Sequence, residues 1–192
     1  SDGQVLTSTG SGVAWEDASG GGISGLDGLV ENNSIWLGND PSGTTDTASY
    51  SVALGTTALD AVTTGDGVTA IGYNALTAST SGPYNTAVGY NSLPSLTDAQ
   101  FNTAVGIEAG IYSNGNYNAF FGAYAGKNKE SGGPQTGDSN TAIGYKSMGN
   151  GVITTAAANT CVGRQSGLAI VDNVNNTLIG AYSGQNITGD NN

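Results

Sequence analysis

The chain has 192 residues, of which 32 are glycine and only 10% are charged. Its 15 acidic and 4 basic residues give a net charge of −11, which disfavours nucleic acid and anionic membranes as partners. There is no histidine and one cysteine, Cys161, so histidine-based triads, histidine metal sites and an intrachain disulfide are excluded. No apolar run is long enough for a membrane-spanning helix, so no membrane insertion is expected.

Residues 1–32 carry no repeat and are predicted to form a short N-terminal module and linker. A run of glycine and serine, Ser19–Gly25, indicates an irregular connection within it. Residues 33–192 are predicted to form one elongated repeat domain, because the same phrase recurs along them.

The phrase is nine residues long, and its clearest copies are NTAVGYNSL from Asn85, NTAVGIEAG from Asn102 and NTAIGYKSM from Asn140. Its central glycine recurs at intervals of 17, 17, 17, 17, 16, 22, 19 and 17 residues. A period of about 20 residues is typical of a solenoid. The glycines are Gly38, Gly55, Gly72, Gly89, Gly106, Gly122, Gly144, Gly163 and Gly180.

Each position of the phrase has its own chemistry. An apolar residue precedes every glycine, and a threonine often stands two residues earlier, as in Thr103 and Val105. In a strand these two columns share a face, and we expect that face to point inward. The column between them is mostly alanine and should meet a second packed surface. A small residue follows three positions after the glycine, and then leucine, methionine or glycine.

The apolar spacing and the glycine content argue against helices. Short strands separated by Gly, Asn and Ser turns fit the pattern, and one coil per repeat would stack at about 4.8 Å. We therefore predict an all-β fold, a parallel β-solenoid of about nine coils. The repeat glycines are expected to turn a corner at a φ that other residues avoid. The asparagine that opens the phrase is expected to bond local backbone, with a stacked amide ladder as the alternative.

The repeats resemble those of trimeric autotransporter adhesin heads, built on N-S-V-A-I-G phrases, and more closely those of phage tail-fibre proteins with NTAVGYxAL phrases. The opening segment Ser1–Trp15 is similar to segments of phage virion proteins. The resemblance implies a left-handed β-roll, three chains side by side and a role in attachment. Gly189–Asn192 matches Gly137–Asn140, which opens a repeat, so a further coil is expected to begin there.

The predicted function is therefore that of a structural and adhesive fibre segment, a viral tail-fibre shaft or receptor-binding region that mediates host attachment. Its expected location is the virion, or otherwise the extracellular space or cell surface. A bacterial trimeric adhesin head is one alternative. An ice-binding solenoid is another, suggested by the threonine column but disfavoured if that column points inward.

No enzymatic activity and no cofactor are expected. Cys161 occupies the alanine column and is interpreted as a buried thiol. Turn formation explains the aspartates, although a glycosidase-like carboxylate pair and a structural Ca²⁺ site stay open for them. These residues are Asp60, Asp66, Asp98, Asp138 and Asp172.

All four basic residues lie between 127 and 164, where both long intervals fall. The insertions 127–137 and 149–158 leave adjacent coils at corresponding points, and solenoid insertions often collect on a binding face. The predicted ligand is an acidic or polar host-surface glycan, or an envelope protein, with ordinary loop variation as the alternative. The candidate residues are Lys127, Lys129, Tyr145, Lys146 and Arg164.

Overall fold

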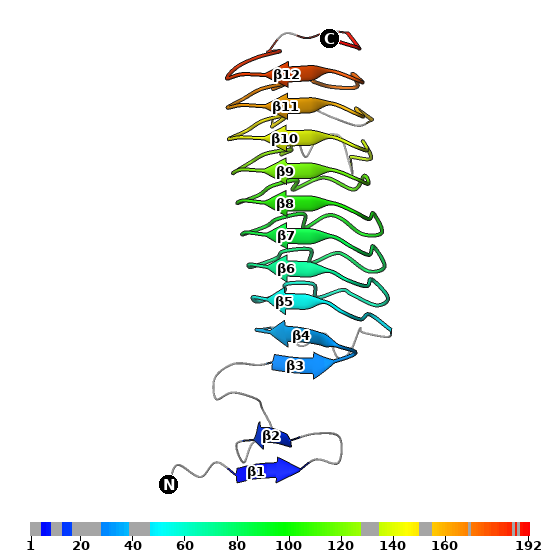
Figure 1. Cartoon of the computed structure of the whole chain (residues 1–192), viewed down its shortest axis with the longest axis vertical. Helices are drawn as coiled ribbons and strands as arrows, with labels where there is room; N and C mark the ends of the chain where they lie inside the picture. The colour runs from blue at the N-terminus through cyan, green and yellow to red at the C-terminus, as the bar shows by residue number, and fades with distance from the viewer. Residues whose placement is uncertain are drawn as a thin grey trace.

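The computed structural model describes residues 5–8, 13–16, 28–38, 47–127, 135–149, 155–168, 170–185, 187 and 189–192. These residues form short strands joined by turns, with no helix among them (Figure 1). The strands are β1 (Val5–Ser8), β2 (Val13–Glu16), β3 (Gly28–Glu31), β4 (Ser34–Leu37), β5 (Val52–Leu54), β6 (Thr69–Ile71), β7 (Thr86–Val88), β8 (Thr103–Val105), β9 (Ala119–Phe121), β10 (Thr141–Ile143), β11 (Thr160–Val162) and β12 (Thr177–Ile179).

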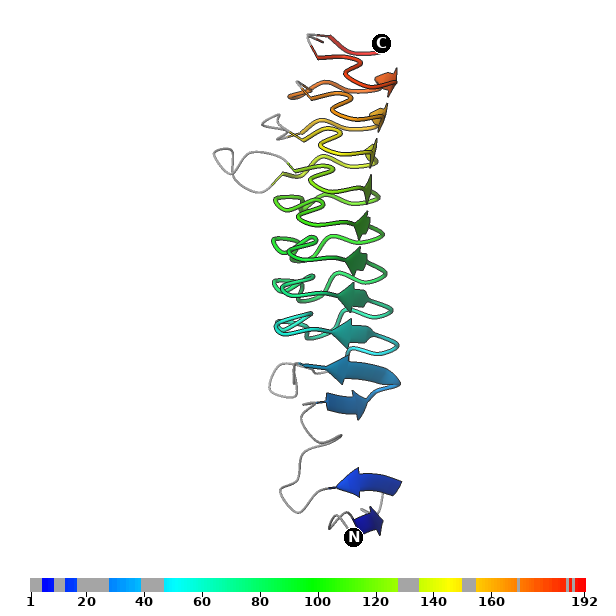
Figure 2. The ribbon, with the colours of Figure 1, turned by 90° about the vertical axis from the view of Figure 1, so that its left-hand side faces the viewer.

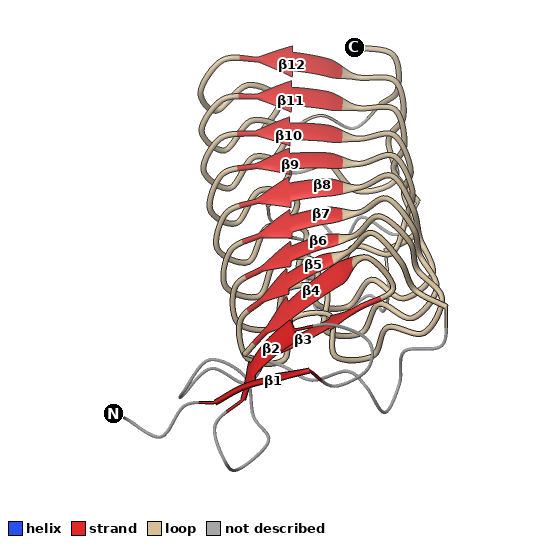
Figure 3. Ribbon diagram, turned by 60° about the horizontal axis from the view of Figure 1, so that its bottom comes forward, coloured by secondary structure: helices blue, strands red, loops and turns tan. Residues whose placement is uncertain are grey.

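Strands β4 to β12 pair in parallel and in chain order, which confirms the parallel β-solenoid. The described chain makes about seven turns. That is fewer than the nine coils expected, because nine stacked strands enclose only eight turns and residues 39–46 of the first are not described. Strand β3 pairs with β4 in the antiparallel sense, and β1 and β2 form a separate two-stranded sheet. The solenoid strands line one side, and turns fill the opposite side (Figures 2 and 3).

The prediction that the threonine and apolar columns point inward is wrong. Ala104 and Ala142 are fully buried, whereas the neighbouring Val105 and Ile143 are 36% and 40% exposed. In the coils that carry leucine or methionine in the opposite turn, the interior has room for little more than a methyl group on the strand side, so the larger β-branched residues face outward. The sheet therefore presents an outer face of threonine and aliphatic side chains.

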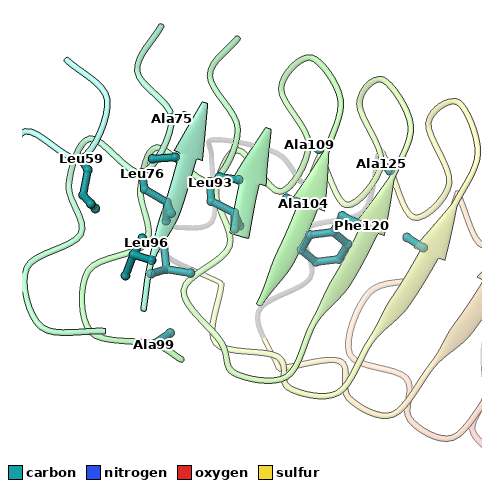
Figure 4. Close-up of a cluster of buried hydrophobic side chains, with 14 of the residues drawn as sticks. Leu59, Ala75, Leu76, Leu93, Leu96, Ala99, Ala104, Ala109, Phe120 and Ala125 are labelled. Carbon is teal, nitrogen blue, oxygen red and sulfur yellow. The ribbon is translucent and has the colours of Figure 1, made fainter. Parts of the chain in front are cut away.

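In the core, the size of the buried strand residue is matched to the size of the residue in the turn opposite. Where the strand residue is alanine, as at Ala70 and Ala87, the turn residue four after the glycine is leucine: Leu76 and Leu93. The large Phe120 instead packs against glycine turns in its own coil and the coil before it (Figure 4). A Cβ at Gly110 would lie 2.7 Å from the Phe120 ring, and one at Gly126 would lie 2.6 Å from it. The Leu, Met or Gly column thus complements the strand column, except that the coil of Ala104 carries Gly110, which leaves room for the Phe120 ring of the next coil.

The repeat glycines turn the corner as predicted. The seven from Gly72 to Gly180 have φ between 119° and 139°, a conformation that side chains rarely allow. Space gives a second reason for glycine, because a Cβ at Gly72 would lie 2.5 Å from the carbonyl oxygen of Gly89 in the next coil. Stacking at this spacing therefore requires glycine at the corner of each coil.

The opening asparagines form the amide ladder that the sequence offered as its alternative. The backbone N–H and Nδ2 of Asn102 donate to Oδ1 of Asn85 at 2.9 and 3.1 Å, and the same pair of bonds joins Asn140 to Asn118 at 2.9 and 3.2 Å. Local bonds are present as well, such as Nδ2 of Asn102 to the carbonyl of Gln100 at 3.1 Å. The amides of Asn85 and Asn102 thus bond both their own turn and a neighbouring coil, whereas Nδ2 of Asn118 donates to the carbonyl of Gly137 in the next coil.

Candidate functional site

The candidate site lies on one long edge of the solenoid, at the residues one and two positions after each repeat glycine. Lys127, five positions after Gly122, joins this edge through its side chain, which lies over the Tyr124 ring. We call this edge the glycine corner. Backbone bonds tie its consecutive coils together: Lys146 donates to the carbonyl of Ala123 at 3.1 Å, and Tyr182 donates to that of Arg164 at 2.9 Å. Side chains here follow one another along the solenoid axis and form a continuous strip.

Four of the strip's side chains cluster around Tyr124. The rings of Tyr124 and Tyr145 meet edge to face with centroids 5.9 Å apart. Lys127 Nζ lies 4.7 Å from the Tyr124 centroid, and Lys146 Nζ lies 5.4 Å from that of Tyr145 and 5.9 Å from that of Tyr124. Glu108, one coil earlier, pairs with Lys127. The structure therefore brings together three of the five residues that the sequence proposed.

Arg164 extends the strip in the direction of the C-terminus. Its guanidinium lies 5.3 Å from the centroid of the Tyr182 ring, and both side chains are exposed. Lys129 falls outside the described residues, as do residues 128–134 and 150–154 of the two insertions. Among the described residues, every lysine and arginine lies on this strip.

The sequence did not single out Tyr124, Tyr182 or Glu108 as site residues. All three stand two positions after a repeat glycine, the same column as Lys146, and have left-handed backbone with φ of 51° to 61°. The repeat places these residues in one column. The residue type in that column differs from coil to coil, so the sequence pattern does not predict a site there.

The exposed groups of the strip are suited to binding a ligand. Tyr145 is 42% exposed and offers an aromatic surface beside Lys146, while Lys127 lies over the neighbouring Tyr124 ring. Such a pairing can hold a planar or sugar-like ring while the cations meet an anionic group. Lys127 is already neutralised in part by Glu108, so Lys146 and Arg164 carry the cationic character.

Other reactive groups lie elsewhere. Cys161 is buried, and burial raises the pKa of its thiol from 9.0 to about 12, against the smaller lowering effect of a hydrogen bond with Ser166. Asp66 and Asp138 accept backbone N–H bonds from the preceding coil, at Ser49 (2.8 Å) and Asn116 (2.6 Å). Asp98 accepts the hydroxyls of Thr80 and Ser81. These aspartates act as turn residues, and no three His, Cys, Asp or Glu side chains gather in the described part of the chain.

No protein-family model, curated protein or solved structure matches the chain. Across the described ranges, no helix has the length and apolar character needed to cross a bilayer. The function is therefore argued from the repeat, the outer sheet face and the strip.

Proposed function

We propose that the chain is a segment of an attachment fibre, a left-handed β-roll that assembles as a parallel homotrimer and binds a surface glycan of a host cell through the glycine corner. A viral tail fibre, carried on the virion, fits this role best. A bacterial surface adhesin with the same fold is the alternative. The observation that carries the proposal is an elongated scaffold with an uncharged apolar face and a separate cationic, aromatic strip.

The apolar face supports self-assembly. Leu54, Phe121 and Ile143 are 45%, 40% and 40% exposed in the single chain, and large exposed apolar patches mark interaction surfaces. The five residues before each repeat glycine include no charged side chain, although the chain carries a net charge of −11. Interface cores are depleted of charge in the same way.

The dimensions of that face agree with an interface. Stacked strands about 4.8 Å apart and residues about 3.3 Å apart give a face roughly 40 Å long and 20 Å wide, or ~800 Å². One partner of a standard protein interface buries about 800 Å². Three copies around a common axis would bury all three faces and leave no strand side exposed.

The glycine corner supports a polar, anionic ligand. The chain is acidic, and the lysines and arginine among its described residues all lie on this strip. They therefore attract anions locally on a surface that otherwise repels them. A shallow site of this kind binds weakly on its own. Three copies on one fibre would raise the apparent affinity through avidity.

Binding of the purified chain to an acidic envelope polysaccharide tests the proposal, with Lys127, Lys146 and Arg164 all replaced by alanine. The substitution changes the net charge from −11 to −14. We expect at least a tenfold loss of affinity and a weaker dependence on salt, with an unchanged melting temperature because exposed charges add little stability. Light scattering on the same samples should report three chains per particle.

A matched control introduces three negative charges away from the strip, as Thr47→Glu, Thr64→Glu and Val171→Glu. All three positions are exposed, and the net charge is again −14. If the control loses binding as strongly as the triple alanine variant, bulk charge rather than the strip controls binding. If the triple alanine variant binds as well as the parent, the strip is not the contact. A particle of one chain would refute the trimer.

The outward threonine column favours one second candidate, an ice-binding solenoid. Thr69, Thr86 and Thr103 repeat along a flat parallel sheet, and the inward orientation that argued against this function is not found. Burial of the face in a trimer would block it. Thermal hysteresis in a solution of the chain would support this candidate against the fibre.

A further inference from the structure

Two columns of aromatic side chains flank the outer face of the sheet, one on each edge. The leading column precedes the ladder asparagines and contains Tyr50, Tyr84, Phe101 and Tyr117. The trailing column follows the repeat glycines and contains Tyr73, Tyr90 and Tyr145, together with the aliphatic Ile107. Both columns are exposed in the single chain, at 41% to 69% of each side chain.

Rings within each column stack along the fibre axis. Tyr84 and Phe101 have centroids 5.2 Å apart at 19°, and Phe101 and Tyr117 have centroids 5.4 Å apart at 6°. In the trailing column, Tyr73 and Tyr90 stack at 5.4 Å and 17°. Each column is thus a preformed apolar ridge one ring thick.

The leading column keeps aromatic residues at backbone positions that do not favour them. Tyr84, Phe101 and Tyr117 have φ of 58° to 59°, a left-handed conformation that glycine and asparagine adopt most easily. The same column does hold Gly67 and Asn175 in other coils. Aromatic rings at a strained position, with half their surface in solvent, indicate a contact that the single chain lacks.

The positions of the two columns determine which column of one chain lies against which column of its neighbour in an assembly. When copies place their outer faces around a common parallel axis, the leading edge of one sheet adjoins the trailing edge of the next. An antiparallel pair about an axis along the strands would instead set leading column against leading column. The aromatic columns therefore distinguish parallel from antiparallel packing.

We infer that the leading column of each chain packs against the trailing column of its neighbour, forming three aromatic seams that hold a parallel trimer in register. The partner is a second copy of this chain, and the inference rests on the self-assembly in the proposed function. The neighbour has the same net charge of −11, and neither ridge places a charged residue beside Tyr84, Phe101, Tyr73 or Tyr90 in its own column. Aromatic residues are enriched at interfaces of this kind.

The seam has a defined end. Beyond Tyr117 the leading column continues as Ser139, Ala158 and Asn175, which are small or polar. In those coils the trailing column carries Tyr145 and Arg164, which the neighbour's small residues cannot cover. The seam therefore closes over the aromatic coils and leaves the cationic strip open to a ligand.

Cysteine cross-linking tests the seam. In a Cys161→Ala background, Tyr84→Cys and Tyr90→Cys are combined and treated with a short bismaleimide. The two positions are six residues apart in one extended phrase, about 20 Å, so a short linker cannot join them within one chain. We expect covalent trimers on a denaturing gel from the double variant and single chains from each single variant. The pair Phe101→Cys and Ile107→Cys serves as the second variant.

Light scattering before cross-linking tests the trimer separately from the aromatic seam. Trimers that do not cross-link at either pair overturn the seam and leave the trimer standing. Single chains from the parent protein overturn both. Cross-linking of Tyr84→Cys alone indicates antiparallel packing and overturns the seam. A double variant that stays folded but no longer assembles supports the seam, because both residues are exposed in the single chain.

Discussion

The substitution Asn118→Ala tests whether the amide ladder stabilises the solenoid. Oδ1 of Asn118 accepts the backbone N–H of Asn140 at 2.9 Å, and its Nδ2 donates to the carbonyl of Gly137 at 3.0 Å. Alanine would leave both groups without these partners in a buried turn, where Asn140 is 3% exposed. The ladder would then be broken at one rung in the middle of the stack.

The magnitude follows from the two orphaned groups. A buried backbone group that loses its hydrogen bond costs about 1–3 kcal/mol, so the two together cost about 2–6 kcal/mol. That is a large share of a total stability of about 5–15 kcal/mol. At about 2–4 °C per kcal/mol for a chain of this size, a loss of ~4 kcal/mol lowers Tm by about 8–16 °C.

Circular dichroism melts and urea titrations of the parent, Asn118→Ala and Asn118→Ser measure this effect. Serine is the matched control because Ser34 already holds this column, where its Oγ accepts the N–H of Ser51 at 2.9 Å. We expect serine to restore the bond to Asn140 but not the bond to Gly137, with about half the loss. A loss below about 1 kcal/mol for alanine, or equal losses for alanine and serine, would refute the reasoning.

Two further predictions concern the core. Phe120→Ala should lower the free energy of unfolding by about 3–5 kcal/mol through the cavity it leaves. Adding Gly110→Leu should recover part of that loss, because Leu93 already occupies the same column with φ of 47°. If urea titrations find the double variant no more stable than Phe120→Ala, the size match is contradicted. The second concerns Cys161, whose pKa burial raises from 9.0 to about 12. The folded state holds the thiol proton more tightly than the unfolded state, so any stability that Cys161 adds over Cys161→Ala is complete below pH 9.0 and is lost as the pH rises toward about 12. Urea titrations from pH 8 to 12 measure this difference, and a constant difference between parent and variant would show that the thiol is not protected.

The period and the glycine column could be predicted from the sequence because their causes are local. Glycine alone tolerates a φ of 119° to 139°, so Gly72 and its equivalents mark the corner without knowledge of the rest of the fold. The direction of the sheet face could not be predicted. Thr103 and Val105 share a face by periodicity alone, but whether it points in or out depends on how much room the finished coil encloses. The burial of Ala104 settles that question.

The candidate strip was only partly predictable. The placement of Lys146 and Arg164 on one edge followed from their positions just after the repeat glycines, since residues one coil apart stack on one edge. Lys127 stands five positions after Gly122, so its contact with Tyr124 did not follow from the repeat. The ring contacts of Tyr124 and Tyr182 depend on side-chain conformation across coils of unequal length, because the intervals around them are 16, 22, 19 and 17 residues. The spacing of the repeats alone predicts on which edge of the solenoid these residues lie, but not which side chains contact one another along that edge.

The parallel stack also determines how the solenoid responds to tension. Its backbone hydrogen bonds and its amide ladder run along the long axis, so a pull on the two ends loads them in series (Figure 1). Coils then peel away one at a time, and the sheet does not shear as a unit. Each released coil of 17 residues lengthens the chain by about 50 Å, the difference between an extended segment and one 4.8 Å step. Under a load on its two ends, the solenoid would thus lengthen in steps of one coil before it unfolds completely.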